Sequence, residues 1–358
     1  MAGRAQGYNL AAMHAQLPIQ HDVSLQPHNT FGIAARARSY LAVDSLACLQ
    51  ALHADPALAR LPRLVLGGGS NIVLTGDFPG LVLHMRNRGM EVLSRDQEAT
   101  LVRVAAGENW HGFVLWSLEQ GLGGLENLAL IPGSVGAAPI QNIGAYGVEM
   151  QERMHSLRVF DPASATLRTL TREQCRFGYR DSIFKHAQER QWVVWDVSFS
   201  FAHAWRPNIS YPELAAELAV ADPAAEPSQP DARAICQAVI AIRQRKLPDP
   251  ARIGNAGSFF KNPVVAAAQH ASLLARHPRL VSYAQRDGSF KLAAGWLIDQ
   301  CGWKGKSLGC AGIHERQALV LVNRGGASGS DILALAQAVR QDVLQRFGVT
   351  LEPEPVLV

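Results

Sequence analysis

A long uncharged stretch, Asn127–Val148, restricts what this chain can fold into more than any other part of the sequence. It is long enough to cross a membrane, but its many glycines, together with Pro132 and Pro139, make it a poor helix. Gln141 and Asn142 stand among its apolar residues and need hydrogen-bond partners when buried. A buried loop packed against its own domain is one interpretation. A flat ligand with apolar faces and polar edges, such as a flavin, is the other.

Composition favours a globular chain of two or three domains. The 358 residues are 48% hydrophobic and 18% charged, which allows a sizeable core. The net charge is +4 and no Lys/Arg run occurs, so an anionic small molecule fits better than a nucleic-acid partner. The five cysteines form no C-x-x-C pair, which predicts buried free thiols in a reducing compartment and no metal site.

The N-terminal residues 1–20 contain no long apolar run. We therefore expect a flexible extension without a secretory signal, a cytoplasmic location and no membrane association.

Hydrophobic periodicity and turn residues predict a mixture of strands and helices. Strands are predicted at 40–45, 61–74 (interrupted by glycines), 80–94, 100–105, 157–160, 166–170, 192–201 and 318–323. Helices are predicted at 46–53, 110–120 with Asn109 as N-cap, 232–246, 264–276, 292–301 and 331–347. Ser330 or Asp331 is expected to cap the last helix and Gly348 to end it. Residues 219–230 are predicted to form a surface loop, and a domain boundary is expected near Pro248–Pro250.

The segment LVLGGGSNIVL, Leu64–Leu74, places three glycines, a serine and an asparagine after an apolar run. Glycines let backbone N–H groups approach a phosphate closely, and the two polar side chains add donors. The segment is neither a Walker A loop nor a Rossmann glycine motif, because no Gly-Lys-Ser/Thr and no helix follow. A plain tight turn is the alternative.

Two further segments carry side chains suited to an anionic substrate. Arg180 stands in CRFGYRDSIF, where a guanidinium can hold a carboxylate through two hydrogen bonds; an ion pair with Asp181 is the alternative. Ser258 follows Gly254–Gly257 in a glycine-bounded turn, where its hydroxyl can relay a proton; a structural turn serine is the alternative. The absence of a G-x-S-x-G elbow argues against a hydrolase nucleophile.

The C-terminus, LEPEPVLV, alternates Glu352 and Glu354 with prolines. In an extended chain these two side chains share a face. The segment is therefore interpreted either as a frayed acidic tail or as a terminal strand tucked into a site.

In their order along the chain, these segments resemble a known enzyme family. The order is GGGSN, GLENLALIPGSVGAAPIQNIGAYG, CRFGYRDSIFK, KLPDP, GNAGSFFKNP, KLAAGWLIDQCG and LEPE. It is similar to the UDP-N-acetylenolpyruvoylglucosamine reductases, from Leu25 to Glu354. Tyr211, in ISYPEL, resembles type I of the family, whose tyrosine-bearing loop closes over the substrate. Pro355 is a departure that bears on how the tail docks.

The resemblance implies an α+β fold: an FAD-binding fold of the vanillyl-alcohol-oxidase (PCMH) type in two subdomains, followed by an α+β substrate-binding domain. The expected division is residues 21–87, joined by a C-terminal strand at 349–358, then 88–246, then the substrate-binding domain at 247–348. The implied activity is NADPH-dependent, FAD-mediated reduction of UDP-N-acetylglucosamine enolpyruvate to UDP-N-acetylmuramate, in peptidoglycan precursor synthesis. A monomer is expected.

Residue by residue, the family motifs imply three catalytic positions, Arg180, Ser258 and Glu354. Positions that contact FAD are Gly67, Gly68, Gly69, Ser70, Asn71, Ile131, Pro132, Gly133, Ser134, Gly136, Gln141, Asn142, Gly144 and Ala145. Positions that contact the substrate or the nicotinamide nucleotide are Tyr146, Tyr211, Lys246, Asn262 and Gln317, with Lys246 facing the pyrophosphate.

The implied mechanism is ping-pong: NADPH reduces FAD and leaves, and the substrate then occupies the same pocket. Arg180 and Glu354 would stabilise the enolate that forms, and Ser258 would donate a proton to the substrate. Two alternatives remain at this point. One is another FAD-dependent oxidase or dehydrogenase on the same scaffold, and the other is a non-catalytic nucleotide-sugar or flavin-binding protein.

Overall fold

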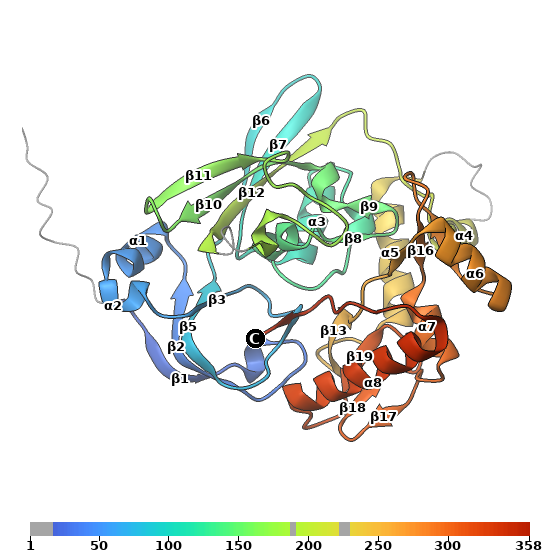
Figure 1. Cartoon of the computed structure of the whole chain (residues 1–358). Helices are drawn as coiled ribbons and strands as arrows, with labels where there is room; N and C mark the ends of the chain where they lie inside the picture. Colours follow the sequence, from blue (N-terminus) through green and yellow to red (C-terminus); the bar gives the residue numbers. More distant parts are fainter. Residues whose placement is uncertain (1–16, 187–190, 222–229) are drawn as a thin grey trace, which may run out of the picture.

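Four strands near the N-terminal end form a mixed sheet in the order β1–β2–β5–β3. The computed structural model describes residues 17–186, 191–221 and 230–358 (Figure 1). β1 runs antiparallel to β2, whereas β2, β5 and β3 are parallel. The helices α1 and α2 connect β2 to β3. The bounds are β1 Gln20–Ser24, a 3-10 turn at Gln26–His28, β2 Arg36–Val43, α1 Leu46–Ala54, α2 Pro56–Ala59, β3 Arg63–Leu66 and β5 Phe78–Met85.

The second sheet is antiparallel throughout, in the order β11–β10–β12–β7–β6. Its strands are β6 Met90–Arg95, β7 Ala99–Ala105, β10 Met154–Asp161, β11 Thr166–Thr171 and β12 Val193–Ala202. The predicted stretch at 80–94 is therefore split between two sheets, and Gly89, with φ 137°, lies at the break. The helix α3, Trp110–Glu119, begins as predicted: the side chain of Asn109 accepts a hydrogen bond from the N–H of Gly112 at 2.8 Å.

The uncharged segment folds without a regular helix. It forms 3-10 turns at Glu126–Leu128 and Val135–Ile140 and the two short strands β8 Gly144–Ala145 and β9 Val148–Glu149. A further 3-10 turn, Met150–Glu152, follows it. Among the described residues, no helix is long and apolar enough to cross a membrane. The irregular backbone expected from its glycines and prolines is confirmed.

The described residues from Pro212 onward contain two smaller sheets and the helices α4 to α8. One sheet has the order β13–β19–β18–β17 and the other β14–β16–β15. The strands are β13 Gly254–Ser258, β14 Val264–Val265, β15 Ser282–Ala284, β16 Phe290–Leu292, β17 Ser307–Leu308, β18 Ala311–Ile313 and β19 Val320–Asn323. The helices are α4 Pro212–Ala221, α5 Ala232–Lys246, α6 Ala267–Arg276, α7 Ala294–Gln300 and α8 Gly329–Phe347, with a 3-10 turn at Ile183–Lys185 upstream.

Three predictions for these elements were wrong in detail. The helix predicted from residue 264 begins at Ala267, because the β-branched Val264 and Val265 pair with β16 instead. The N-cap of α8 is Ser328, which forms a capping box with Asp331, rather than Ser330 or Asp331. The loop predicted at 219–230 begins later, because α4 continues to Ala221; residues 222–229 lie outside the described residues. Gly348 ends α8 as predicted, with φ 66°.

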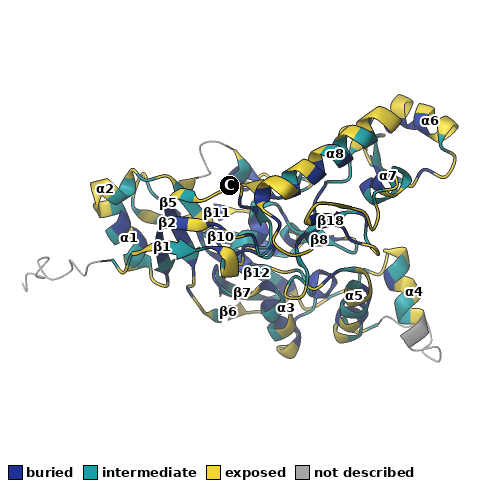
Figure 2. Cartoon of the chain, turned by 90° about the horizontal axis from the view of Figure 1, so that it is seen from below, coloured by how far each residue is buried: buried dark blue, intermediate teal, exposed yellow. Residues whose placement is uncertain are grey.

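Buried residues of the first sheet, whose strands β2 and β5 are labelled in Figure 2, belong to two separate hydrophobic cores. Leu41 and Leu83 belong to the core shared with the second sheet, while Tyr40 and Val82 belong to the core shared with the C-terminal third. Because side chains alternate between the two faces of a strand, β2 and β5 join both cores. This sheet therefore fixes the position of the C-terminal third relative to the second sheet.

The C-terminal tail returns to the first part of the chain. β20, Val356–Leu357, pairs in parallel with β4, Ile72–Val73, which directly follows the GGGSN segment. The carbonyl oxygen of Val358 accepts hydrogen bonds from the backbone N–H and the hydroxyl of Thr75, both at 2.7 Å. The docked-strand interpretation is confirmed, and Pro355 is buried without preventing it.

We predict that Gly69→Ala lowers the free energy of unfolding by at least about 2 kcal/mol. Gly69 has φ 61°, and a Cβ atom there would lie 2.0 Å from the carbonyl oxygen of His28. Gly76→Ala is the matched control, because a Cβ there meets no heavy atom within 4 Å; we expect a change below about 0.5 kcal/mol. Urea unfolding of both variants measures the difference, and equal effects would contradict this role for Gly69.

Candidate active site

Two glycine-containing segments line one side of a cavity of about 260 Å³. These are Gly67–Asn71, between β3 and β4, and Ile131–Ser134, from the uncharged segment. Arg180, Ser258 and Glu354 line the same cavity, although they come from three distant parts of the chain. A larger cavity of about 1140 Å³ continues from it and shares Gly67, Ser134 and Lys185 among its lining residues. The three expected catalytic residues therefore lie together.

The two segments approach one another so closely that side chains would not fit. A Cβ atom on Gly67 would lie 2.2 Å from Oγ of Ser134, and one on Gly68 would lie 2.9 Å from Cα of Gly133. Ser70 donates a hydrogen bond from Oγ to the carbonyl oxygen of Pro132 at 3.1 Å. Gly68 is thus required by contact with the backbone of Gly133, and Gly67 leaves room for the side chain of Ser134.

The same segment offers a row of backbone donors. Among the described residues, none accepts a backbone hydrogen bond from the N–H groups of Gly67–Asn71. Successive backbone N–H groups without protein acceptors form a concave site for an anion such as a pyrophosphate. The lining residues therefore fit a dinucleotide cofactor, with its phosphates at this segment and its flat ring in the adjoining cavity.

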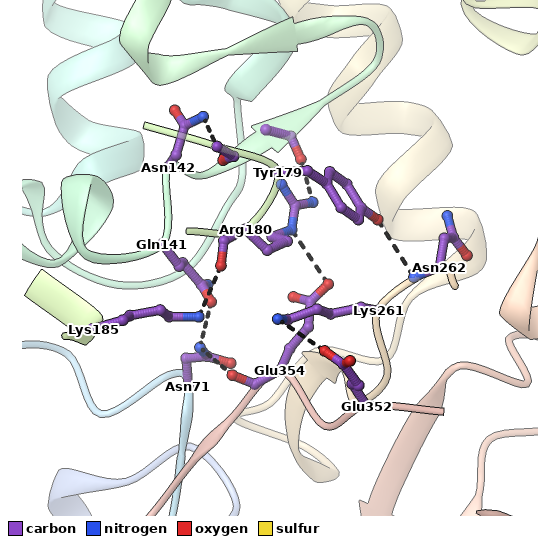
Figure 3. Close-up of polar contacts among 12 residues, drawn as sticks. Asn71, Gln141, Asn142, Tyr179, Arg180, Lys185, Lys261, Asn262, Glu352 and Glu354 are labelled. Atoms are coloured by element: carbon purple, nitrogen blue, oxygen red, sulfur yellow. Dashed lines mark hydrogen bonds and ion pairs between the residues drawn. The ribbon is translucent and has the colours of Figure 1, made fainter. Parts of the chain in front are cut away.

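Arg180 and Glu354 form an ion pair in this cavity, with Nε to Oε1 at 3.2 Å (Figure 3). Arg180 also donates from Nη2 to the carbonyl oxygen of Gly144 at 2.8 Å. Its backbone is left-handed, with φ 55°, which an L-residue adopts at a cost. Ser182 anchors the same loop by donating to the carbonyl oxygen of Ile140 at 2.6 Å. The alternative pairing with Asp181 is absent from the described residues: Asp181 lies 3.3 Å from His186.

Glu354 is nearly buried, with 10% of its side chain exposed. Burial raises the pKa of its carboxyl group, and the nearby Arg180, Lys185 and Lys261 oppose that rise without cancelling it. Its backbone N–H donates to Phe259 and its carbonyl oxygen accepts from the amide of Asn71 at 3.3 Å, so the main chain around it is fixed. Glu352, two residues earlier, is 71% exposed and pairs with Lys261. The two glutamates therefore differ in burial, although the sequence predicts that they share a face.

The sequence predicts that Ser258 stands in a turn. In the structure it is instead the last residue of the strand β13. It pairs with Val320, after a register irregularity that begins at Asn255. Gly257, with φ 70°, lies inside this irregularity. A bulge of this kind redirects the side chain that follows it, and the half-buried Ser258 lines the cavity.

Asn71 and Gln141 lie beside Glu354, whereas Asn142 is held by other partners. Nδ2 of Asn71 donates to Oε1 of Gln141 at 2.7 Å (Figure 3). Asn142 is fully buried and donates to the carboxylate of Glu149 at 2.7 Å and to the carbonyl oxygen of Gly178 at 3.1 Å. The protein itself therefore satisfies Asn142. Gly144 and Ala145 line the smaller cavity and Gly136 the larger one.

The five residues expected to contact substrate lie outside the lining of the smaller cavity. The rings of Tyr146 and Tyr211 meet edge to face, with centroids 5.2 Å apart. Lys246 pairs with Glu213 at 2.6 Å on the surface. Asn262 accepts a hydrogen bond from the N–H of Ala294 at 2.9 Å, and Gln317 accepts one from Leu319 at 3.4 Å.

Two lysines near Glu354 were not identified from the sequence. Lys185 donates from Nζ to the carbonyl oxygen of Arg180 at 2.8 Å, and burial lowers the pKa of its ammonium group (Figure 3). Lys261 reaches Glu352 at 3.3 Å. Lys185 stands five positions after Arg180 in CRFGYRDSIFK. Its place in the same motif as Arg180 could have identified it as a candidate site residue.

Comparison with known proteins identifies the family. Residues 249–358 match a family model described as UDP-N-acetylenolpyruvoylglucosamine reductase, C-terminal domain, and residues 37–171 match an FAD binding domain. A UDP-N-acetylenolpyruvoylglucosamine reductase of Paraburkholderia phymatum is 58% identical over 340 residues, covering 95% of this chain and 98% of that protein. One from Burkholderia mallei is 56% identical over 335 residues, covering 94% and 96%. The chain belongs to the UDP-N-acetylenolpyruvoylglucosamine reductase family.

The fold agrees with this membership. The crystal structure of the UDP-N-acetylenolpyruvylglucosamine reductase from Thermus caldophilus superposes with a TM-score of 0.65 at 24% identity, covering 95% of this chain and 99% of that one. The predicted fold class, α+β with an FAD-binding part of the vanillyl-alcohol-oxidase type, is confirmed.

We predict that replacing Glu354 by Gln in this reductase changes how stability depends on pH. The carboxyl has a folded-state pKa above its ordinary value of 4.5, so the folded state binds its proton more tightly than the unfolded state does. The contribution of the Glu354 carboxyl to the free energy of unfolding is therefore fully present below pH 4.5. It is lost as the pH rises through the raised pKa of the folded state. The Gln variant lacks this loss, so its free energy of unfolding relative to wild type rises between acidic and neutral pH.

Urea unfolding across that pH range measures the difference. Glu352→Gln is the matched control, because the exposed Glu352 carboxylate makes a surface pair worth about 0–1 kcal/mol. A constant difference between Glu354→Gln and wild type at all pH values would contradict the burial effect.

Proposed function

We propose that this chain reduces UDP-N-acetylenolpyruvoylglucosamine to UDP-N-acetylmuramate, with FAD as cofactor and NADPH as reductant, in peptidoglycan precursor synthesis. The observation that carries the proposal is the meeting of Arg180, Ser258 and Glu354 in one cavity lined by the two glycine-containing segments. Relatives at 56–58% identity bear the name of this reductase.

FAD would be held by Gly67, Gly68, Gly69, Ser70, Asn71, Ile131, Pro132, Gly133, Ser134, Gly136, Gln141, Gly144 and Ala145, which line the two cavities. Asn142 would act indirectly, by fixing the segment through Glu149 and Gly178. When bound, FAD supplies the hydride transfer that no protein side chain provides. The remaining work of binding, charge stabilisation and proton donation belongs to the chain.

Arg180 would stabilise negative charge on the enolpyruvyl carboxylate as the double bond is reduced. Its Nε and Nη2 are held by Glu354 and Gly144, which orients the guanidinium. A donor fixed before the reaction needs no reorganisation when charge develops, and this is the usual source of a large electrostatic contribution.

Glu354 would assist Arg180 as an acid rather than as a second anion. A deprotonated carboxylate beside the substrate carboxylate would repel it, whereas the raised pKa of Glu354 favours the protonated form, which donates a hydrogen bond. Ser258 would deliver the proton that completes the reduction at the substrate carbon. Its ordinary hydroxyl is a weak acid, so a carbanion-like centre is the kind of base it can protonate.

Tyr146, Tyr211, Lys246, Asn262 and Gln317 would bind the nucleotide part of the substrate or of NADPH farther from the reacting atoms. Lys246 is paired with Glu213 and would exchange that carboxylate for a pyrophosphate. Tyr211, with 37% of its surface exposed, rests on Tyr146 and would move toward the ligand.

The division into residues 21–87 with 349–358, 88–246 and 247–348 belongs to the same proposal. A monomer acting on small molecules in the cytoplasm is the assembly and location that we propose. The five free cysteines and the use of NADPH fit a reducing compartment.

Flavin absorbance after rapid mixing tests the function. Bleaching by NADPH, followed by recovery on adding UDP-N-acetylenolpyruvoylglucosamine without oxygen, is the expected result. Recovery only with oxygen would indicate an oxidase on the same scaffold, and no bleaching would indicate a binding protein without this activity.

Ser258→Ala tests the proton donor. We expect bleaching by NADPH to keep its rate while recovery with substrate slows by about 10²–10⁴-fold, the usual loss for a positioned proton donor. Ser70→Ala, which alters a hydroxyl at the glycine-rich segment of the same cavity, is the control and should leave the ratio of the two rates unchanged. Equal slowing of both steps by Ser258→Ala would contradict the role.

A further inference from the structure

A second arginine side chain, besides Arg180, lines the smaller cavity, and neither family match includes it. Arg243 belongs to α5 and lines the cavity together with Trp110, Ile131 and Ser258. It lies between residues 37–171 and 249–358, the segments that match family models. The catalytic positions named so far lie elsewhere in the cavity wall, so Arg243 has no role yet.

The guanidinium of Arg243 has no counter-ion in the part of the chain that the structure describes. Its Nε is buried and makes no hydrogen bond. Its polar neighbour is the hydroxyl of Tyr146, which is neutral, since burial raises the pKa of that hydroxyl to about 12. By contrast, the partly buried Arg158 pairs with Asp196 and Arg180 pairs with Glu354.

A buried cation without an anion is costly. Burial lowers the pKa of Arg243, because removal from water destabilises the charged form of the guanidinium. The neighbouring His111 adds to it, because burial and Arg243 both lower the pKa of that imidazole and so disfavour a second positive charge. A fold keeps such a group where a ligand supplies the negative charge.

We propose that Arg243 provides the positive charge that stabilises the reduced flavin. A flavin that accepts a hydride without a proton gains one negative charge, which resides on the N1–C2=O edge of its pyrimidine ring. Arg243 would face that edge and hold the charge without transferring a proton. This inference rests on the proposed function, because it requires FAD in this cavity.

The surroundings favour the flavin over the substrate as the source of the anion. Trp110 and Ile131 lie within the part of the chain that matches the FAD binding domain, and they line the same cavity as Arg243. The substrate carboxylate already has Arg180 and Glu354. The proposed pyrophosphate ligand, Lys246, stands on the surface with Glu213.

The test compares Arg243→Met, which removes the charge, with Arg243→Lys, which keeps it. Arg245→Met is the matched control: it lies on the same helix, is exposed and pairs with Glu217. The flavin potential of each holoenzyme is measured by equilibration with redox dyes, and the spectrum of the reduced enzyme is recorded against pH. Nucleotide sugar is left out, so the result does not depend on which substrate the enzyme uses.

We expect Arg243→Met to lose at least tenfold in its preference for reduced over oxidised FAD, which lowers the two-electron potential by about 30 mV per tenfold. The pKa at which the reduced flavin anion takes up a proton should rise, so the spectrum of neutral reduced flavin should persist to a higher pH than in wild type. Arg243→Lys should restore most of both properties, and Arg245→Met should change neither.

An unchanged potential and spectrum, with a raised KM for the nucleotide sugar, would overturn the assignment to flavin. So would equal loss of affinity for oxidised and reduced FAD, measured by fluorescence titration of the FAD-free protein. Arg243→Gln is the second uncharged variant if Arg243→Met does not fold. Failure of the proposed function is seen separately, as wild-type enzyme whose reduced flavin UDP-N-acetylenolpyruvoylglucosamine does not reoxidise.

Discussion

The ion pair between Arg180 and Glu354 depends on chain segments that are brought together only by the complete fold. Glu354 reaches the cavity because β20 pairs with β4, and β4 directly follows the glycine-rich segment Gly67–Asn71. Arg180 reaches it because Ser182 ties its loop to Ile140 in the uncharged segment. The same contacts therefore position the Arg180–Glu354 pair and the two segments proposed to bind the cofactor.

Burial and charge act against each other at this pair, and burial has the larger effect on the carboxyl group. Three cationic side chains surround Glu354, yet its pKa lies above the ordinary value. Desolvation penalises a buried charge directly, whereas each cation at this partly solvated cavity is screened. The outcome is a carboxyl group that takes up a proton more readily than an exposed glutamate does, beside a guanidinium that Gly144 also holds.

The sequence motifs predicted which residues lie together in the cavity. Physical reasoning on the sequence explained only part of the contacts that bring them together. The glycines of GGGSN were assigned to ligand contact, but their contact with Gly133 and Ser134 depends on a pairing between segments about sixty positions apart, which no local pattern encodes. The helix Ala232–Lys246 followed from its periodicity, whereas the role of Arg243 on it did not, since an arginine near a helix end is ordinarily exposed. Ser328 was missed as a cap because two other polar residues next to it fit the same pattern equally well.

Tyr146 connects the uncharged segment to Arg243. Its backbone is left-handed, with φ 48°, and its carbonyl oxygen accepts from Asn127 at 2.9 Å, so the ring is held where its hydroxyl meets Arg243. Tyr211 packs on the outer edge of the same ring. A movement of Tyr211 on nucleotide binding would therefore shift the ring of Tyr146 and change the position of its hydroxyl relative to Arg243. Under the proposed function, these three neighbouring side chains would link nucleotide binding near Tyr211 to the positive charge of Arg243.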